Sequence, residues 1–182
     1  MLYQQKVSHH STSGLNKTNL YMKQLALYLF AATIMVSCNE KHESVEIAKE
    51  KTEIMIKEEK QKIETLLSEY KKSLNTSDAK LAQSLYTKDG IFMPTQAPSG
   101  IGSEGILKSY EFVFSQIQLN IEFFIEEIEV EGNMAFAVTS SKGSVKILAN
   151  GVEAPEANRE LFVFEKVNGE WKIARYMFNK TK

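Results

Sequence analysis

The sequence predicts one α+β domain, and three observations carry this prediction. Apolar residues recur at helical spacing over residues 63–117, and they alternate with polar residues over residues 119–179. The alternation slips by one residue near Glu126, which predicts a bend in the first long strand. Helices followed by antiparallel strands pack on one side of the sheet. We therefore expect three N-terminal helices packed on a bent, mostly antiparallel sheet, which together form a cone open at one end.

An apolar run over residues 25–36 follows Lys23 and precedes Cys38, the single cysteine of the chain. A basic start, an apolar core and a small residue before a cut site are typical of a secretory signal peptide. The run is too short for a membrane span, which needs about 20 residues. Residues 35–38 (MVSC) resemble the lipobox of bacterial lipoproteins, with methionine in the first place. We expect residues 22–37 to be removed and Cys38 to carry lipid, although a buried free cysteine and a transmembrane helix are the alternatives.

The segments around this signal have separate interpretations. Residues 1–21 show no periodicity, and a start at Met22 gives a signal peptide of ordinary proportions. We expect Met22 to be the true initiator and residues 1–21 to be an artefactual extension. Glu and Lys alternate over residues 38–62, which predicts a solvated helix that tethers the domain to the membrane. The domain itself then covers residues 63–179, and residues 180–182 are a tail.

Composition restricts the partners. Three lysines and no acidic residue precede Cys38, so the rest of the chain carries a net charge of −4. Nucleic-acid binding depends on clustered Lys and Arg, so no nucleic-acid partner is expected. Lipidation of Cys38 would leave no thiol for a disulfide. The protein is expected in the bacterial cell envelope, lipid-anchored outside the cytoplasm.

The helical part divides into three helices. Residues 75–78 (NTSD) break the first helix and supply caps for a second helix. Residues 88–90 are expected to turn into a brief strand over residues 91–93, which Pro94 ends. Ser103 is expected to cap the third helix. The buried positions predicted on the three helices are Ile63, Leu66, Leu67, Tyr70 and Leu74, then Leu81, Ala82 and Leu85, then Ile106, Tyr110, Val113, Phe114 and Ile117.

The remainder is predicted to be sheet. The alternating positions of the first long strand change phase between Ile125 and Ile128, which indicates a β-bulge near residues 126–127. Turn signals at residues 132–133, 150–151 and 168–169 separate the next strands. The predicted strands are residues 119–130, 134–148, 160–165 and 171–179.

Residues 63–94 (IETLLSEYKKSLNTSDAKLAQSLYTKDGIFMP) resemble the opening of the nuclear transport factor 2-like superfamily, which includes ketosteroid isomerase and SnoaL-like polyketide cyclases. These residues and the closing run NGEWKIARYMFN are similar to the SgcJ/EcaC subfamily. The resemblance covers residues 63–179 and implies the cone-shaped nuclear transport factor 2-like (cystatin-like) fold. It implies much less about function, because this superfamily contains enzymes, ligand carriers and association modules.

The residues of ketosteroid isomerase are only partly present. That enzyme needs a catalytic base and an oxyanion hole built from a Tyr and a protonated Asp. Tyr70 stands eight residues before Asp78, as the tyrosine does in the family pattern. The base would fall at Met93 or Pro94, neither of which accepts a proton, and the oxyanion acid would fall at about Glu160. Ketosteroid isomerisation is therefore not expected.

The domain also lacks the residues that histidine, thiol, metal or dinucleotide chemistry would need. His9, His10 and His42 all precede the domain, so it holds no His base, His metal ligand or Cys nucleophile. Asp78 and Asp89 are expected in turns, and no Gly-rich dinucleotide loop supports the oxidoreductase label that the subfamily often carries. We expect no cofactor and no metal. Whether the domain is an enzyme stays open.

Strand alternation predicts the candidate pocket. It places Trp171, Arg175 and Asn179 on one face of the last strand, which the superfamily pattern turns into the cone. Glu160 on the partner strand is then expected to meet Arg175. A structural ion pair, with Tyr70 as an ordinary core tyrosine, is the alternative. The predicted pocket residues are Tyr70, Met93, Glu160, Phe162, Trp171, Arg175, Met177 and Asn179.

Three functions follow from this pattern. The first is a lipid-anchored, extracytoplasmic protein that binds a small apolar or mixed-polarity molecule. The second is an isomerase, lyase or cyclase with Glu160 as acid/base and Tyr70 as hydrogen-bond donor. The third is a dimerisation module whose cone is filled, and a homodimer is expected in any case. A cavity below about 100 Å³, against the roughly 300 Å³ of ligand sites, would favour the third.

Overall fold

The computed structural model describes residues 17–181, with side chains from residue 45 onward. Of the described residues, 52–181 form one compact unit and 17–51 form another. Helix α1 (Lys17–Asn75) contributes to both units. Met22, the predicted signal peptide and Cys38 all lie before residue 45, where no side chains are described. The predictions of a start at Met22, a signal peptide and a lipidated Cys38 therefore stay predictions. Within the described part of the chain, no helix is long and apolar enough to cross a membrane.

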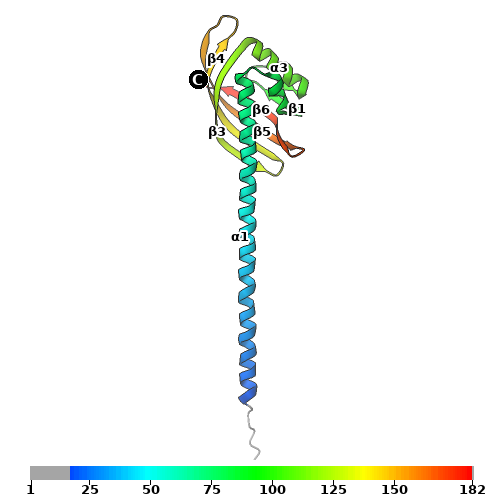
Figure 1. The fold of residues 1–182 in the computed structure, drawn as a ribbon, viewed down its shortest axis with the longest axis vertical. Helices are drawn as coiled ribbons and strands as arrows, with labels where there is room; N and C mark the ends of the chain where they lie inside the picture. Colours follow the sequence, from blue (N-terminus) through cyan, green and yellow to red (C-terminus); the bar gives the residue numbers. More distant parts are fainter. Residues whose placement is uncertain (1–16, 182) are drawn as a thin grey trace, which may run out of the picture. The chain divides into compact units, whose positions relative to one another are not determined.

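The compact unit contains three helical segments and a mostly antiparallel sheet, as the sequence predicts (Figure 1), and the sheet has six strands because Gly100–Ile101 adds one that was not predicted. The strand order is β2-β1-β6-β5-β4-β3, and β1 and β6 are the parallel pair in an otherwise antiparallel sheet. The last turns of α1 cross the inner face of this sheet. The other elements are α2 (Ala79–Ser84), α3 (Gly102–Gln116), β1 (Tyr86–Met93), β2 (Gly100–Ile101), β3 (Ile117–Glu131), β4 (Met134–Ile147), β5 (Glu153–Val167) and β6 (Glu170–Lys180).

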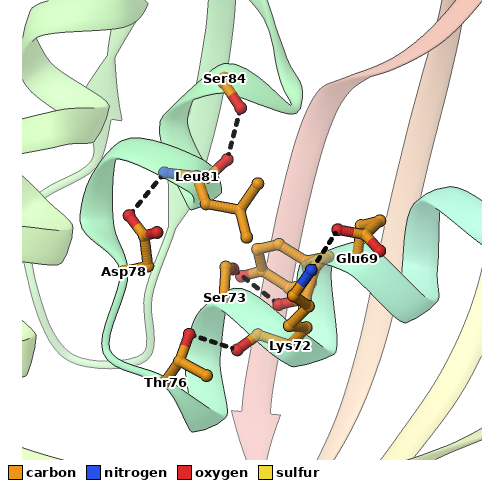
Figure 2. Close-up of polar contacts among 8 residues, drawn as sticks. Glu69, Lys72, Ser73, Thr76, Asp78, Leu81 and Ser84 are labelled. Carbon is orange, nitrogen blue, oxygen red and sulfur yellow. Dashed lines mark hydrogen bonds and ion pairs between the residues drawn. The ribbon is translucent and has the colours of Figure 1, made fainter.

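The junction between α1 and α2 is closed by local hydrogen bonds (Figure 2). Ser77 takes a left-handed backbone (φ 53°), and the Ser77 and Asp78 amides donate to the last carbonyls of α1, on Leu74 and Ser73. This is the Schellman pattern, with serine in the place that glycine usually holds. The Asp78 carboxylate then accepts from the Leu81 amide at 2.9 Å and caps α2, as the sequence predicts.

Asn75 fastens the end of α1 to the edge of the sheet. Its side-chain amide donates to the Ile121 carbonyl and accepts from the Ile121 amide, both at 2.9 Å. Because β3 is an edge strand, this pair occupies backbone groups that no other strand reaches. The predicted bulge in β3 is confirmed, since pairing with β4 passes from Ile125 to Glu127 and leaves Glu126 out.

A second bulge, which the alternation does not predict, lies in β6. Val163 pairs with Arg175 and the next residue of β5, Phe164, pairs with Ile173, so Ala174 is the extra residue. A bulge of one residue reverses the faces of everything beyond it. Trp171 and Ile173 are buried as predicted, but Tyr176 then turns inward.

The predicted inward positions of Arg175, Met177 and Asn179 are therefore wrong. All three alternate with Tyr176 and Phe178, and they lie on the outer face of the sheet. The Arg175 guanidinium instead donates to the carbonyl oxygens of Ala174 (2.6 Å) and Asp89 (3.4 Å). An arginine on the outer face cannot neutralise a carboxylate on the inner one.

Three smaller predictions also change. Residues 88–90 belong to β1, where the pairing with β6 is irregular, and they do not form a turn. Ser103 does not cap α3, because the N-cap position is Ile101, which makes no side-chain capping bond. β5 begins at Glu153, seven residues before the predicted start at residue 160.

The core lies between the helices and the inner face of the sheet. Tyr70, at 1% exposure, packs edge-on against Tyr176 and Phe162, with ring centroids 5.2 and 5.5 Å away. Phe162 and Phe164 continue the stack along β5. The largest fully buried side chains are Tyr70, Tyr110, Phe162, Phe164, Ile63, Leu67, Ile106 and Ile173.

Glu59 ties α1 to the β5–β6 hairpin. Its carboxylate accepts from the Trp171 indole at 2.7 Å and pairs with Lys166 at 2.5 Å and Lys62 at 2.8 Å. Lys166 also lies 4.8 Å from the centre of the Trp171 ring. The Lys166 and Lys62 ammonium groups lower the pKa of Glu59 to about 2.

We predict that this carboxylate makes stability depend on pH. Its pKa is about 2 in the folded chain and 4.5 ordinarily, so its contribution is complete above pH 4.5 and is lost as the pH falls toward 2. Glu59→Gln should lower the free energy of unfolding by about 1–3 kcal/mol at pH 7, and less in acid. Thermal melts from pH 7 to pH 3 measure this, with the exposed neighbour Glu58→Gln as control. A deficit independent of pH would contradict the assignment.

Candidate functional site

One cavity of about 230 Å³ opens on the inner side of the sheet. Its walls come from α1, α3, four strands and the loop after β1. The lining is mostly apolar, and its polar groups lie mainly on one strand. The lining residues are Tyr70, Leu74, Phe92, Pro94, Thr95, Ala97, Tyr110, Val113, Ile117, Leu119, Ile121, Glu156, Asn158, Glu160, Tyr176, Phe178 and Lys180.

The polar groups form a strip along β5. Glu156, Asn158 and Glu160 occupy every second position of this strand, so all three point to the same face. Each is at least 93% buried. Buried polar groups require partners, and the three residues differ in how well that requirement is met.

Glu160 is held by hydroxyl groups alone. Thr139 donates to Oε2 at 2.5 Å, while Ser141 and Tyr176 donate to Oε1 at 2.9 and 3.3 Å. No cation pairs with it among the described residues. Burial raises the pKa of the Glu160 carboxyl above its ordinary value, against the opposing effect of these hydroxyls. A carboxyl with a raised pKa in a cavity is suited to exchange a proton with a bound molecule.

Asn158 connects Glu160 to the mouth of the cavity. Its amide nitrogen donates to Ser141 Oγ and to Glu156 Oε1, each at 3.2 Å. The second carboxylate oxygen of Glu156 accepts from Lys180 Nζ at 2.9 Å. Because an ionised carboxylate only accepts, the amide nitrogen of Asn158 must face Glu156, which fixes the orientation of the amide. Its carbonyl oxygen, Oδ1, is buried and has no hydrogen-bond partner.

A chain of tyrosine hydroxyls adjoins the cavity. Tyr110 OH lies 2.5 Å from Tyr70 OH and 2.8 Å from Tyr86 OH. Burial raises the pKa of all three phenols well above the ordinary value, so all three stay protonated. Three protons serve two hydrogen bonds, so one of the three hydroxyls keeps a proton that these two bonds do not use. Tyr70 is the end that lines the cavity.

Aromatic rings form another part of the wall. Phe92 stacks on Tyr110 with ring centroids 4.7 Å apart and on Tyr176 at 5.7 Å. Phe178 continues this stack 6.2 Å from Phe92. The cavity therefore has an aromatic, apolar side next to the strip of polar groups on β5.

The structure brings together two of the eight predicted pocket residues. Tyr70 and Glu160 both line the cavity. Phe162 lies behind it in the core, stacked on Tyr176 at 4.2 Å, and Trp171 faces Glu59. Met93, Arg175, Met177 and Asn179 lie on the outer face, so the predicted pair of Glu160 and Arg175 does not form.

Sequence reasoning missed most of the polar strip. Glu156 and Asn158 stand four and two residues before Glu160, and period-two alternation from Glu160 would have found them if β5 had been extended back to Glu153. Tyr176 and Phe178 were missed because the bulge at Ala174 has no clear signature in the sequence. In the part of the chain with described side chains, no three carboxylate, imidazole or thiolate groups converge at metal-binding spacing.

Comparisons with known proteins agree with this geometry. A family model described as "SnoaL-like domain" matches residues 63–178. A ketosteroid isomerase-like protein from Erwinia carotovora atroseptica is 29% identical, with TM-score 0.64, over 66% of this chain and 94% of that one. A nuclear transport factor 2-like superfamily protein from Salmonella enterica is 21% identical, with TM-score 0.61, over 68% and 91%. A conserved protein from Planctomyces limnophilus is 21% identical, with TM-score 0.60, over 68% and 98%. No curated protein sequence matches the chain.

Proposed function

This chain belongs to the SnoaL-like domain family, and from that premise we propose that it binds a small molecule in the cavity between its helices and sheet. The observation that supports this most is the cavity itself, about 230 Å³ of mostly apolar space with a few convergent polar groups. A dimerisation module with a filled cone would have much less space. The Asn158 carbonyl, buried without a partner at the cavity wall, is a group that a ligand would satisfy.

The size of the cavity limits the ligand. A buried cavity of about 150 Å³ accommodates benzene, whereas drug-sized ligands occupy about 300–1,000 Å³. A cavity of about 230 Å³ therefore suits one ring with a few substituents, or an aliphatic chain of similar volume. A steroid would need the mouth to widen.

We further propose that the protein is a lipid-anchored member of the bacterial cell envelope, within the SgcJ/EcaC subfamily. The support is the order of Lys23, the apolar run at residues 25–36 and Cys38 at the end of MVSC. A charged segment of α1 over residues 38–62 would then act as a tether to the membrane. The subfamily assignment rests on the motifs at residues 63–94 and 168–179.

An enzymatic function of the isomerase, lyase or cyclase type is the second candidate. It is favoured because Glu160, a carboxyl with a raised pKa, and the Tyr70 phenol line one cavity. Glu160 would move a proton while Tyr70 stabilises negative charge on an oxygen. Deuterium uptake from D₂O into a bound ketone, lost in Glu160→Gln, would support this function. Absence of uptake would remove it.

The outer face of the sheet supports a proposed homodimer. Val138, Leu161, Met177 and Met93 pair in register across β4, β5, β6 and β1, which makes one apolar row. Leu161 and Met177 are each 38% exposed. A contiguous exposed apolar row is typical of an interface. We predict a dimer in sedimentation velocity that Leu161→Lys dissociates, and a monomeric parent chain would contradict this proposal.

We predict that filling the cavity abolishes ligand retention. Leu119→Trp adds volume at the cavity wall and should cost about 1–3 kcal/mol of stability without unfolding the domain. Native mass spectrometry of protein from its own host should show a small bound molecule in the parent chain and none in the variant. Ile125→Trp, an exposed position on the same strand, is the control and should retain the molecule. Equal retention by both variants would place the ligand elsewhere.

We also predict that Cys38 directs processing. If it is lipidated, the mature chain should partition into the detergent phase, and Cys38→Ser should accumulate as an unprocessed precursor. Labelling with a fatty-acid analogue, followed by mass spectrometry of the N-terminal peptide, measures this. A soluble product cut at another position would overturn the anchor. Changing Met1 should leave the amount of protein intact if translation starts at Met22.

A further inference from the structure

We propose that the cavity selects a small organic cation, a protonated amine carried on an apolar body of about one ring, and discriminates against anions. The inference rests on the proposed binding function and deepens it by naming the chemical class of the ligand. Two features of the cavity support it: a buried carboxylate that no cation neutralises, and a buried acceptor without a donor.

The charged groups that line the cavity are mostly negative. They are Glu156, Glu160 and Lys180. Lys180 lies at the mouth, its side chain is 60% exposed, and it pairs with Glu156. Because Lys180 and Glu156 neutralise each other, the remaining charge in the cavity is that of Glu160. This charge attracts a cation and repels an anion in a site shielded from water.

Asn158 presents an acceptor without a donor. Among the described residues, its Oδ1 and Thr87 Oγ1 are the buried side-chain oxygens that lack a partner. The carboxylate of Glu156 holds the Asn158 amide so that its oxygen cannot exchange places with the nitrogen. An unpaired buried acceptor is destabilising, and a ligand N–H would supply its missing hydrogen bond. A carboxylate or phosphate ligand has no donor to offer this oxygen.

Glu160 has capacity for one more donor. An ionised carboxylate offers about four lone-pair sites, and three hydroxyl groups occupy three of them. Neutral hydroxyls do not neutralise its charge, so desolvation is only partly offset. A ligand ammonium would supply both the fourth hydrogen bond and the missing positive charge. The two acceptors, Glu160 and Asn158, are two positions apart on the same strand face, and both residues line the cavity.

The aromatic wall suits the same ligand. Phe92, Tyr110 and Phe178 form a stack that borders the cavity. These rings bury the apolar body of an amine.

Three probes of matched size and different charge test the proposal. Benzylamine is a cation, benzyl alcohol is a neutral donor, and benzoate is an anion. Each is titrated into the full chain in a non-ionic detergent at pH 7, with affinity measured by NMR chemical shifts of the cavity residues. We expect benzylamine to bind at least tenfold more tightly than benzoate, with benzyl alcohol between them.

Two variants locate the preference. Glu160→Gln keeps the shape of the side chain and removes its charge, so it should weaken benzylamine tenfold or more and leave benzyl alcohol almost unchanged. Asn158→Leu removes the free acceptor and should weaken both benzylamine and benzyl alcohol. Glu153→Gln, an exposed carboxylate on the same strand, is the matched control and should change none of the three affinities.

The outcomes separate the two proposals. Binding of benzyl alcohol with no preference for benzylamine over benzoate overturns the cation inference and leaves the binding function intact. A preference for benzylamine that survives Glu160→Gln also overturns it, because the charge would then act from another site. No binding of any probe at millimolar concentration overturns the proposed binding function, and the inference with it.

Discussion

One extra residue in the last strand decides which side chains face the cavity. Ala174 has no partner in the pairing of β5 with β6, so the strand reverses its faces after Ile173. Tyr176 and Phe178 consequently reach the inside, while Arg175 passes to the outer face. Had the strand continued without a bulge, Arg175 would point at the inner face, where Glu160 lies. Tyr176 and Phe178 would then point to the outer face, and the cavity would lose two of its aromatic residues.

The consequence is a buried carboxylate without a counter-ion. Glu160 is 5% exposed and accepts hydrogen bonds from three hydroxyl groups. These bonds use most of its hydrogen-bonding capacity, but they do not neutralise its charge. Burying such a group costs free energy, and domains retain these costs mainly at functional sites. The aromatic core around Tyr70 offsets part of this free-energy cost. The contacts that hold α1 to the sheet offset more of it, through Asn75 at one end and Glu59 at the other. Both the proposed amine ligand and the enzymatic alternative use this same carboxylate.

The sequence predicted the fold well where local signals dominate. The buried stripe of α1, the Asp78 cap and the bulge near Glu126 all leave residue patterns that a reader of the chain can find. The candidate site was predicted less completely, because it depends on pairing between distant strands. Nothing local marks Ala174 as an extra residue, and the opposing irregularity of β1 at residues 87–90 is equally invisible before β1 and β6 are paired. Tyr70 and Glu160 were found by resemblance. Glu156 and Asn158 were missed because the predicted strand began at residue 160, whereas β5 begins at Glu153.

The protonation of Glu160 tests this account most directly. Its carboxyl can be titrated by NMR of selectively labelled glutamate in the parent chain and in Arg175→Met. If the bulge isolates Glu160 from Arg175, its pKa should lie above the ordinary glutamate value in both proteins and be the same in each. A pKa at or below the ordinary value in the parent chain, rising in Arg175→Met, would show that the two residues meet inside the cone. The account of the cavity given above would then be wrong.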